Sequence, residues 1–301
     1  LADEGYVGRD DAGALAEAYR FLRTLEHRLQ IVHDLQTHEL PADTASRTVL
    51  ARSLGMEGGE QLLAESTGKE GTGILPIESE PLGPPEVYSA RRLFVALGEQ
   101  TEVARLDALA AAGHPVVRLP VDGASSPAAL GGEFFRWEMA TAIAGYVLGI
   151  NPFDQPNVQE AKDATKAILA SGSIEDPGFD DLGVLLRKVG KGDYVAILAY
   201  LDRTSETEDA IERVRVAIRD HYRVATTTGF GPRFLHSTGQ LHKGSANNGV
   251  FIQVVDAERS FDLPIPGQSF SFGTLIDAQA LGDLRSLRGR GRRVARVTLE
   301  Q

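Results

Sequence analysis

Cysteine is absent from this sequence, and several other features are scarce. With no cysteine among 301 residues, disulfides, thiolate nucleophiles and cysteine-ligated metal sites are excluded. No run of apolar residues approaches the ~18 residues of a membrane-spanning helix. The first residues also lack the basic and apolar pattern of a signal peptide. We therefore expect a cytoplasmic protein that has no membrane partner.

Positive charge is scarce as well, because acidic residues outnumber basic ones and the net charge is −11. A nucleic-acid-binding protein needs a basic surface, so nucleic acid is not expected as a partner. One basic cluster, Arg288–Arg293, precedes the last predicted strand. Blocks of like charge are mostly solvated, and this one is expected to be a solvated turn.

The first sixty residues have a helical pattern. Apolar residues recur at steps of three or four between residues 10 and 35, which predicts a long amphipathic helix. A second helix is predicted from about Asp43 to Leu54, and a cluster of glycines then interrupts the pattern. We therefore predict a helical segment over residues 1–57 and a separate domain over 58–301.

Beyond residue 60 the pattern changes to strands that alternate with helices. The strands are predicted at 92–97, 115–119, 194–200, 222–226, 249–255 and 294–299. The helices are predicted at 99–112, 132–148, 157–170, 206–220 and 272–287, and a loop rich in glycine and proline at 71–85. Such alternation predicts the α/β class, with a mainly parallel sheet flanked by helices.

The first candidate site is the patch from Gln61 to Lys69. Glu65 lies near the end of a predicted helical stretch, with Gln61 one turn earlier on the same face. Ser66, Thr67, Gly68 and Lys69 follow as a polar turn. A single carboxylate can move a proton between neighbouring carbons of a sugar. The alternative is a plain helix end with a glycine stop and Lys69 near the helix dipole.

The second candidate site is the segment Asn151–Lys162. Two prolines fix a turn that presents Asp154 and Gln155 at a rigid edge. Lys162 follows Gln155 by about two helical turns and can share its face. A positioned lysine can neutralise a phosphate or an enediolate oxygen. The alternative is that Lys162 is a solvated charge on a helix.

The third candidate site is the stretch Gly231–Gly244, which we expect to be a polar loop. His236 and His242 are six residues apart, which fits no common zinc spacing, and no metal is expected. A histidine here could act as the acid that opens a sugar ring, or it could have a structural role. Thr226–Gly229 could hold a phosphate at a strand end, with a plain strand end as the alternative.

These residues resemble glucose-6-phosphate isomerase, in particular the isomerase half of bifunctional transaldolase/glucose-6-phosphate isomerase proteins. The resemblance covers about residues 60–301 and includes the Glu65–Gly71 patch, the stretch Phe134–Lys162 and the segments Pro232–Gln240 and Pro264–Gly267. It implies a sugar-isomerase (SIS)-type subdomain without a cofactor. It also implies Glu65 as the catalytic base, Lys162 as the active-site lysine and Gln61, Ser66, Thr67, Gly68 and Gln155 as substrate-binding residues.

The sequence departs from this family in two ways. The family's ring-opening histidine follows a Gly-Gln pair soon after the base, whereas here the nearest such pair is Gly239-Gln240. His236 or His242 is the candidate for that role, and His236 is preferred. The family also has two α/β subdomains, and only the second is recognised. The first would supply the phosphate-binding serines and threonines, so it is expected in trans or through a homodimer.

Residues 1–56 instead resemble glutamate–ammonia-ligase adenylyltransferase, the regulator of glutamine synthetase. The segments Ala18–Arg23, Leu25–Gln30 and Gln36–Pro41 carry this resemblance. It implies a helical segment beyond the nucleotidyltransferase site, without that site's acidic metal ligands. A gene fusion near residues 57–60, or two sequences joined there during genome assembly, accounts for both resemblances.

Together these observations predict interconversion of glucose 6-phosphate and fructose 6-phosphate through an enediol, weak or absent in this chain. The reaction belongs to glycolysis, gluconeogenesis and the pentose phosphate pathway. The alternatives are a non-catalytic fused fragment with a structural or regulatory role, or a fragment of glutamine synthetase adenylyltransferase. The sequence further predicts that Glu65, Gln155 and Lys162 converge at the carboxyl edge of the sheet.

Overall fold

The computed structural model describes residues 59–98, 102–119, 127–154, 165–170, 177–256 and 262–298. The chain divides into two compact units, Leu1–Gly59 with Val121–Arg136 and Glu60–Pro120 with Trp137–Gln301. The predicted helices at 10–35 and 43–54 lie outside the described residues. In the described part, the second unit holds two sheets, and every strand pairing in them is parallel. The α/β prediction is therefore confirmed.

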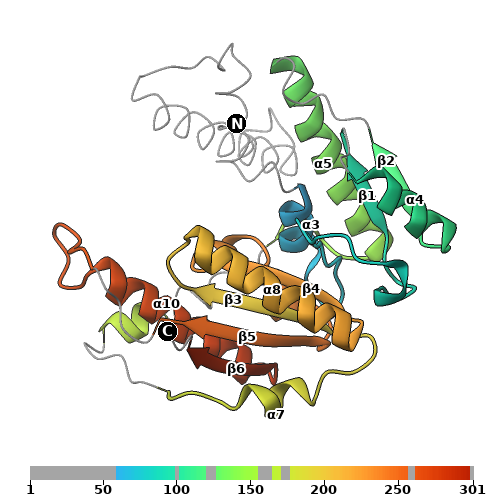
Figure 1. Ribbon diagram of the computed structural model, residues 1–301. Coiled ribbons are helices and arrows are strands. Elements are labelled where there is room, and N and C mark those ends of the chain that lie inside the picture. The colour runs from blue at the N-terminus through green and yellow to red at the C-terminus, as the bar shows by residue number, and fades with distance from the viewer. Residues whose placement is uncertain are drawn as a thin grey trace, which may run out of the picture. The chain divides into compact units, whose positions relative to one another are not determined.

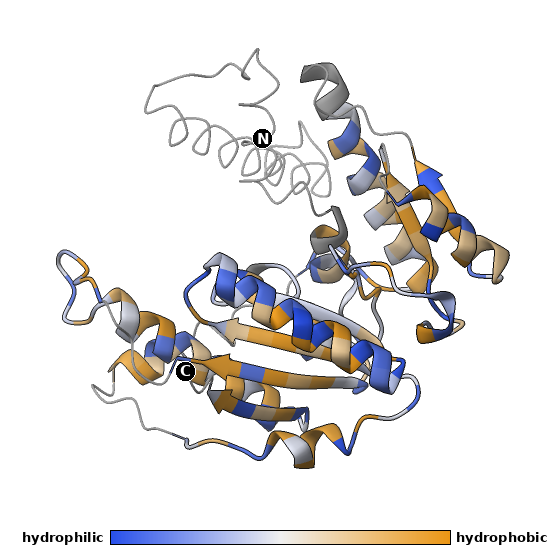
Figure 2. Cartoon of the chain, viewed as in Figure 1, coloured by the Kyte–Doolittle hydropathy of each residue, from blue (hydrophilic) through white to orange (hydrophobic). Residues whose placement is uncertain are grey.

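The larger sheet has four strands in the order β4-β3-β5-β6. They are β3 Tyr194–Tyr200, β4 Ala225–Phe230, β5 Gly249–Val255 and β6 Arg293–Thr298 (Figure 1). All seven residues of both β3 and β5 are buried, as expected for central strands of a parallel sheet covered on both faces. In Figure 2 these two strands are mostly hydrophobic.

The helices of this sheet lie on opposite faces. Helix α8 (Ser205–Tyr222) connects β3 to β4, and α10 (Phe272–Gly289) connects β5 to β6. The two connections run outward from the β3–β5 pair in opposite directions, so crossovers of the usual right-handed sense place the helices on opposite faces. Ile211 and Ile218 of α8 pack on one face, and Ala280 and Leu287 of α10 on the other.

Capping residues explain where both helices begin. The Thr204 hydroxyl accepts from the Thr207 backbone N–H at 3.3 Å, and the Thr207 hydroxyl accepts from the Thr204 N–H at 3.0 Å. This reciprocal pair satisfies two donors that a helix N-terminus leaves unpaired. The Ser271 hydroxyl likewise accepts from the Thr274 N–H at 3.1 Å at the start of α10. Short α7 (Leu182–Leu186), which the sequence did not predict, packs through Leu185 on the α8 face.

The smaller sheet pairs β1 (Phe94–Leu97) with β2 (Val116–Leu119), and α4 (Val103–Ala111) connects them. Leu109 of α4 packs against Phe94 and Tyr88. Before this sheet come α3 (Gly59–Thr67), an extended segment and the one-turn helix η1 (Pro85–Val87); after it comes α5 (Pro127–Leu148). Residues 165–170 are helical, and the rest of the predicted helix at 157–170 lies outside the described residues.

The structure corrects the sequence prediction at the start of β4 and over residues 231–244. Strand β4 begins at Ala225 rather than Tyr222, because α8 continues through Tyr222 and ends at Arg223 in a left-handed conformation (φ 54°). The expected polar loop at 231–244 is instead η2 (Arg233–His236) followed by α9 (Gly239–Gly244). The five residues Gly239–Lys243 are buried. This segment is therefore a packed part of the fold.

Candidate functional site

The Glu65 patch is held at the end of α3 by its own side chains. The Thr67 hydroxyl donates to the Leu63 carbonyl at 2.6 Å and accepts from the Ile74 N–H at 3.0 Å. Thr67 is fully buried. A hydroxyl bonded in both directions stabilises the helix end and fixes the chain that follows. Thr67 therefore has a structural role at the helix end, and its assignment to substrate binding stays a prediction.

Gly68 lies where α3 meets α9 with no space for a side chain. A Cβ at this position would lie 2.3 Å from the Leu241 Cα. The Gln240 side-chain amide donates to the Gly68 carbonyl at 2.9 Å, and the Gly71 N–H donates to the Gly244 carbonyl at 2.9 Å. Gly68 is therefore needed for backbone contact between α3 and α9, segments about 170 residues apart in sequence.

Glu65 is half-buried on α3, and this position changes its acidity. Burial raises the pKa of Glu65 from its usual 4.5 to about 7, while the positive charge of Lys69 acts in the opposite direction. A carboxylate with a pKa near neutral pH can both accept and return a proton under working conditions. Ser66 next to it is half-buried.

Lys69 brings the two candidate patches together. Its ammonium lies 2.7 Å from the Asp154 carboxylate and also donates to the Asp154 carbonyl. The Lys69 side chain is 2% exposed and that of Asp154 is 53% exposed. The turn before Asp154 is fixed by the Asn151 side chain, which accepts from the Phe153 N–H at 3.0 Å. The end of α3 and the turn at 151–154 are thus neighbours, although 85 residues separate the paired side chains.

The remaining site residues of the sequence analysis are only partly described. Gln155 and Lys162 lie outside the described residues, as do the side chains of Gln61 and His236. Their convergence with Glu65 stays a prediction.

His242 is not suited to the role of a ring-opening acid. It is fully buried, and both ring nitrogens are without a hydrogen-bond partner among the described residues. Burial lowers the pKa of His242 to about 3, and the nearby charges of Lys243 and Arg292 act in the same direction. The ring is therefore neutral at physiological pH, and it packs against Tyr194 and Phe251.

Thr226–Gly229 does not form a phosphate-binding strand end. These residues lie within β4, and Thr226 and Thr227 are buried. The Thr226 hydroxyl donates to the Glu80 carboxylate at 3.3 Å.

The expected solvated turn at Arg288–Arg293 is also partly wrong. Arg293 pairs with both oxygens of Asp193 at 2.7 Å, and Arg292 donates to two backbone carbonyls.

Sequence reasoning missed a second buried lysine–aspartate pair. The Lys243 ammonium of α9 lies 2.6 Å from the Asp283 carboxylate of α10, and the two side chains are 3% and 1% exposed. Burial and the adjacent Asp283 carboxylate raise the pKa of the Tyr200 hydroxyl well above its usual value. Lys243 stands in a polar sequence, so composition gave no signal that it is buried.

Within the described ranges, no group of three or more His, Asp or Glu residues could hold a metal ion. The described helices also include none with the length and apolar character needed to cross a membrane.

Comparison with known proteins finds similarity at the N-terminal end. The family model of GlnD PII-uridylyltransferase matches residues 1–69 of the 301. The bifunctional glutamine synthetase adenylyltransferase/adenylyl-removing enzyme of Streptomyces coelicolor is 55% identical over 56 residues. The enzyme of the same name from Bordetella pertussis is 54% identical over 63 residues. The predicted adenylyltransferase-like N-terminal segment is therefore confirmed.

These matches are short relative to either partner. The Streptomyces match covers 19% of this chain and 6% of the relative, and the Bordetella match covers 20% and 7%. A solved structure, that of a hypothetical protein from Thermus thermophilus, aligns over 96% of this chain and 86% of its own, with 16% identity and a TM-score of 0.34.

The family match extends through α3 and therefore includes Glu65 and Lys69. The helix end at Glu65 thus lies within the match to the GlnD PII-uridylyltransferase model. The isomerase resemblance of residues 60–301 stays a prediction.

Proposed function

We propose that Glu65 is the proton-transferring base of an aldose–ketose isomerisation. The reaction interconverts glucose 6-phosphate and fructose 6-phosphate through an enediol. The observation that carries this proposal is the half-buried Glu65 carboxylate, whose pKa is about 7. A base of this pKa takes a proton from one sugar carbon and returns it to the next without a large penalty in either direction.

The contact between Lys69 and Asp154 supports this assignment. It holds the end of α3 beside the turn at 151–154, from which the chain continues to Gln155 and Lys162. In the proposed reaction Lys162 neutralises the enediolate oxygen, and Gln61, Ser66 and Gln155 orient the sugar. The reaction would serve glycolysis, gluconeogenesis and the pentose phosphate pathway in the cytoplasm.

The proposed rate is low for the chain by itself. Positioning of the substrate can contribute ~7–11 kcal/mol to catalysis, and the phosphate is the group by which a sugar phosphate is held. The buried threonines of β4 do not provide this grip. A first isomerase subdomain, supplied in trans or by a homodimer, is proposed to complete the site.

Solvent deuterium exchange tests this proposal at very low rates. Fructose 6-phosphate is incubated with a high concentration of the protein in deuterium oxide, and incorporation at the carbon next to the carbonyl is followed by mass spectrometry. We expect slow exchange above the buffer background and its loss in Glu65→Gln. The matched control is Glu70→Gln, since Glu70 is an exposed glutamate of the same turn. Exchange that is absent, or that persists in Glu65→Gln, contradicts the proposal.

A second candidate is a non-catalytic helical segment of the adenylyltransferase type. The 55% identity to the Streptomyces enzyme, together with the family match through residue 69, favours it. In that case Glu65 and Lys69 are structural residues of a helix end. This candidate predicts no deuterium incorporation by the wild-type protein.

A further inference from the structure

A large open pocket lies at the amino edge of the four-stranded sheet, the edge where its strands begin. Its volume is about 1420 Å³. One wall is the segment that runs from Gly71 to Leu97, and the other is formed by the residues that precede β3, β4 and β5. Trp137 also contributes to the lining. All of these residues belong to the second unit of the chain.

Buried arginines of α8 hold the wall formed by the segment Gly71–Leu97 in place. The Arg215 guanidinium donates to the Glu78 carbonyl at 2.7 Å, and Arg219 donates to the Pro81 carbonyl at 2.6 Å. Both arginine side chains are buried. Hydrogen bonds from charged donors in a buried position are among the stronger ones in proteins. The wall is therefore attached to the sheet domain through fixed contacts.

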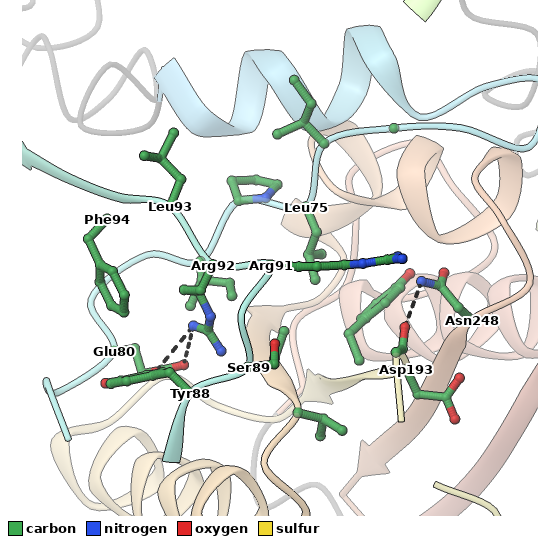
Figure 3. Close-up of a pocket in the computed structure, with 18 of the residues that line it drawn as sticks. Leu75, Glu80, Tyr88, Ser89, Arg91, Arg92, Leu93, Phe94, Asp193 and Asn248 are labelled. Atoms are coloured by element: carbon green, nitrogen blue, oxygen red, sulfur yellow. Dashed lines mark hydrogen bonds and ion pairs between the residues drawn. The ribbon is translucent and has the colours of Figure 1, made fainter. Parts of the chain in front are cut away.

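Two adjacent arginines of this wall have different surroundings. Arg92 turns to Glu80, 3.4 Å away, and its guanidinium stacks on the Tyr88 ring at 5.0 Å. Arg91 instead extends across the pocket toward Asn248 (Figure 3). Arg91 is exposed, and no described residue forms an ion pair or a hydrogen bond with its side chain. The Arg91 charge is therefore available to a ligand.

Two more cations stand at the starts of neighbouring strands. Lys191 lies in the turn before β3, and Arg223 follows α8 just before β4. Tyr194 of β3 is paired with Ala225 of β4, so the two turns are adjacent at a strand spacing of ~4.8 Å. Both side chains line the pocket, are exposed and have no ion-pair partner among the described residues.

The acidic residues of the lining do not neutralise these cations. Glu80 pairs with Arg92 and Arg219, Glu102 with Arg105, and Asp193 with Arg293. Glu86 is the one lining acid without an ion-pair partner in the described part of the chain. The lining thus contains three unpaired positive charges and one unpaired negative charge, in a chain whose net charge is −11. The carboxyl end of α8 adds only about half a negative charge.

We propose that this pocket binds a phosphate-bearing small organic molecule, whose phosphate contacts Arg91, Lys191 and Arg223. Guanidinium and ammonium groups recognise phosphate oxygens through charge-assisted hydrogen bonds. The organic part of the ligand contacts the apolar lining, which includes Leu75, Leu93 and Trp137. Leu63 of α3 lines the pocket but Glu65 does not, so this site is separate from the proposed catalytic site.

Calorimetric titration of the full chain with three probes tests this site. The probes are glucose 6-phosphate, adenosine monophosphate and inorganic phosphate, each at low and at high salt. We expect one of the two organic phosphates to bind at submillimolar concentration, more tightly than inorganic phosphate and more weakly at high salt. The probe that binds identifies the organic part as a sugar or a nucleoside. Binding by neither, or equal binding of inorganic phosphate, overturns the proposal.

Substitutions locate the ligand within the molecule. Arg91→Ala and Lys191→Ala should each weaken binding by about tenfold, the effect of losing one charge-assisted hydrogen bond. The matched control is Arg213→Ala, because Arg213 is exposed on α8 outside the pocket lining. Its affinity should equal that of the wild type. An equal loss in all three variants would mean nonspecific attraction and would overturn the site.

Glu65→Gln separates this site from the proposed isomerase. The variant should lose deuterium exchange and keep its affinity for the organic phosphate. Loss of binding in Glu65→Gln would place the ligand at α3 and contradict the pocket assignment.

Discussion

Two lysine–aspartate pairs connect distant segments of this protein, and they differ in how far the carboxylate is from water. Lys243 and Asp283 are both almost completely buried between α9 and α10. Lys69 is equally buried between α3 and the turn at 151–154, but half of the Asp154 side chain is exposed. The first pair lies within the closed core of the sheet domain. The second lies in a region where solvent reaches one partner.

The difference shows what an ion pair can contribute in each place. Breaking a buried pair leaves one uncompensated charge in a low-dielectric interior, and that charge is destabilising. A half-exposed carboxylate is still solvated when its partner is removed, so its pair contributes less. The Lys243–Asp283 pair therefore specifies the packing of α9 on α10, while the Lys69–Asp154 pair positions a candidate site.

Removal of the Asp283 carboxylate should have the largest effect. Asp283→Ala leaves the Lys243 ammonium buried without a counter-charge, and we expect a loss of about 3–5 kcal/mol in the free energy of unfolding. Urea denaturation followed by circular dichroism measures it. The double variant Lys243→Met with Asp283→Leu should recover most of this loss. A loss below about 1 kcal/mol in Asp283→Ala would mean that this pair resembles an exposed one.

A methyl group at Gly68 should have the next largest effect. The added Cβ would lie 2.3 Å from the Leu241 Cα, so the backbones of α3 and α9 must separate. We expect Gly68→Ala to cost about 1–3 kcal/mol, the range for overpacked sites. The control is Gly132→Ala in α5, where nothing lies within 4 Å of the added Cβ and where alanine favours the helix. Equal stabilities in the two variants would contradict the close contact between α3 and α9.

Asp154→Ala should cost less than either change. Lys69 loses its carboxylate partner, but the backbone carbonyl of residue 154 can still accept from the lysine, and removal of the half-exposed Asp154 side chain lets water reach the ammonium. We expect a loss of about 1 kcal/mol in a denaturation experiment. The same variant should also reduce the rate of deuterium exchange, because the turn at 151–154 is then held less firmly to the end of α3. A loss as large as that of Asp283→Ala would remove the distinction between the two pairs.

Glu65→Gln should change the stability by an amount that depends on pH. The folded protein holds the Glu65 proton up to about pH 7, whereas the unfolded chain releases it near 4.5. Folding therefore binds a proton between these values, and stability falls as the pH rises through this range. Compared with the wild type, Glu65→Gln should be more stable at pH 8 and nearly equal at pH 4. Melting temperatures across this range measure the difference, and a constant difference would contradict the raised pKa.

The sequence predicted the sheet domain well where the local pattern and the fold agree. Tyr194–Tyr200 and Gly249–Val255 are apolar runs without an internal breaker, and the structure gives both strands the predicted bounds. The start of β4 was wrong by three residues because α8 extends into the segment predicted as a strand. The helix α9 was missed because tertiary contacts with α3 and α10 bury a short polar sequence that has little helix signal of its own.

The candidate site could be predicted only in part. The helix end at Glu65 and the proline-bounded turn at 151–154 both carry local signals. Their contact through Lys69 and Asp154 depends on the path of the chain over 85 residues, which no local pattern contains. The pocket cations gave no signal either, because Arg91, Lys191 and Arg223 line one pocket only when separate elements are folded together.

The position of Trp137 has a practical consequence for measurement. It is the only tryptophan in the sequence, and it belongs to the lining of the amino-edge pocket. Light absorbed at the red edge of the protein spectrum excites this indole alone, so its emission comes from one wall of one cavity. A molecule that enters the cavity changes the polarity around the indole and with it the colour and intensity of that emission. The protein thus carries a built-in optical reporter that needs no label.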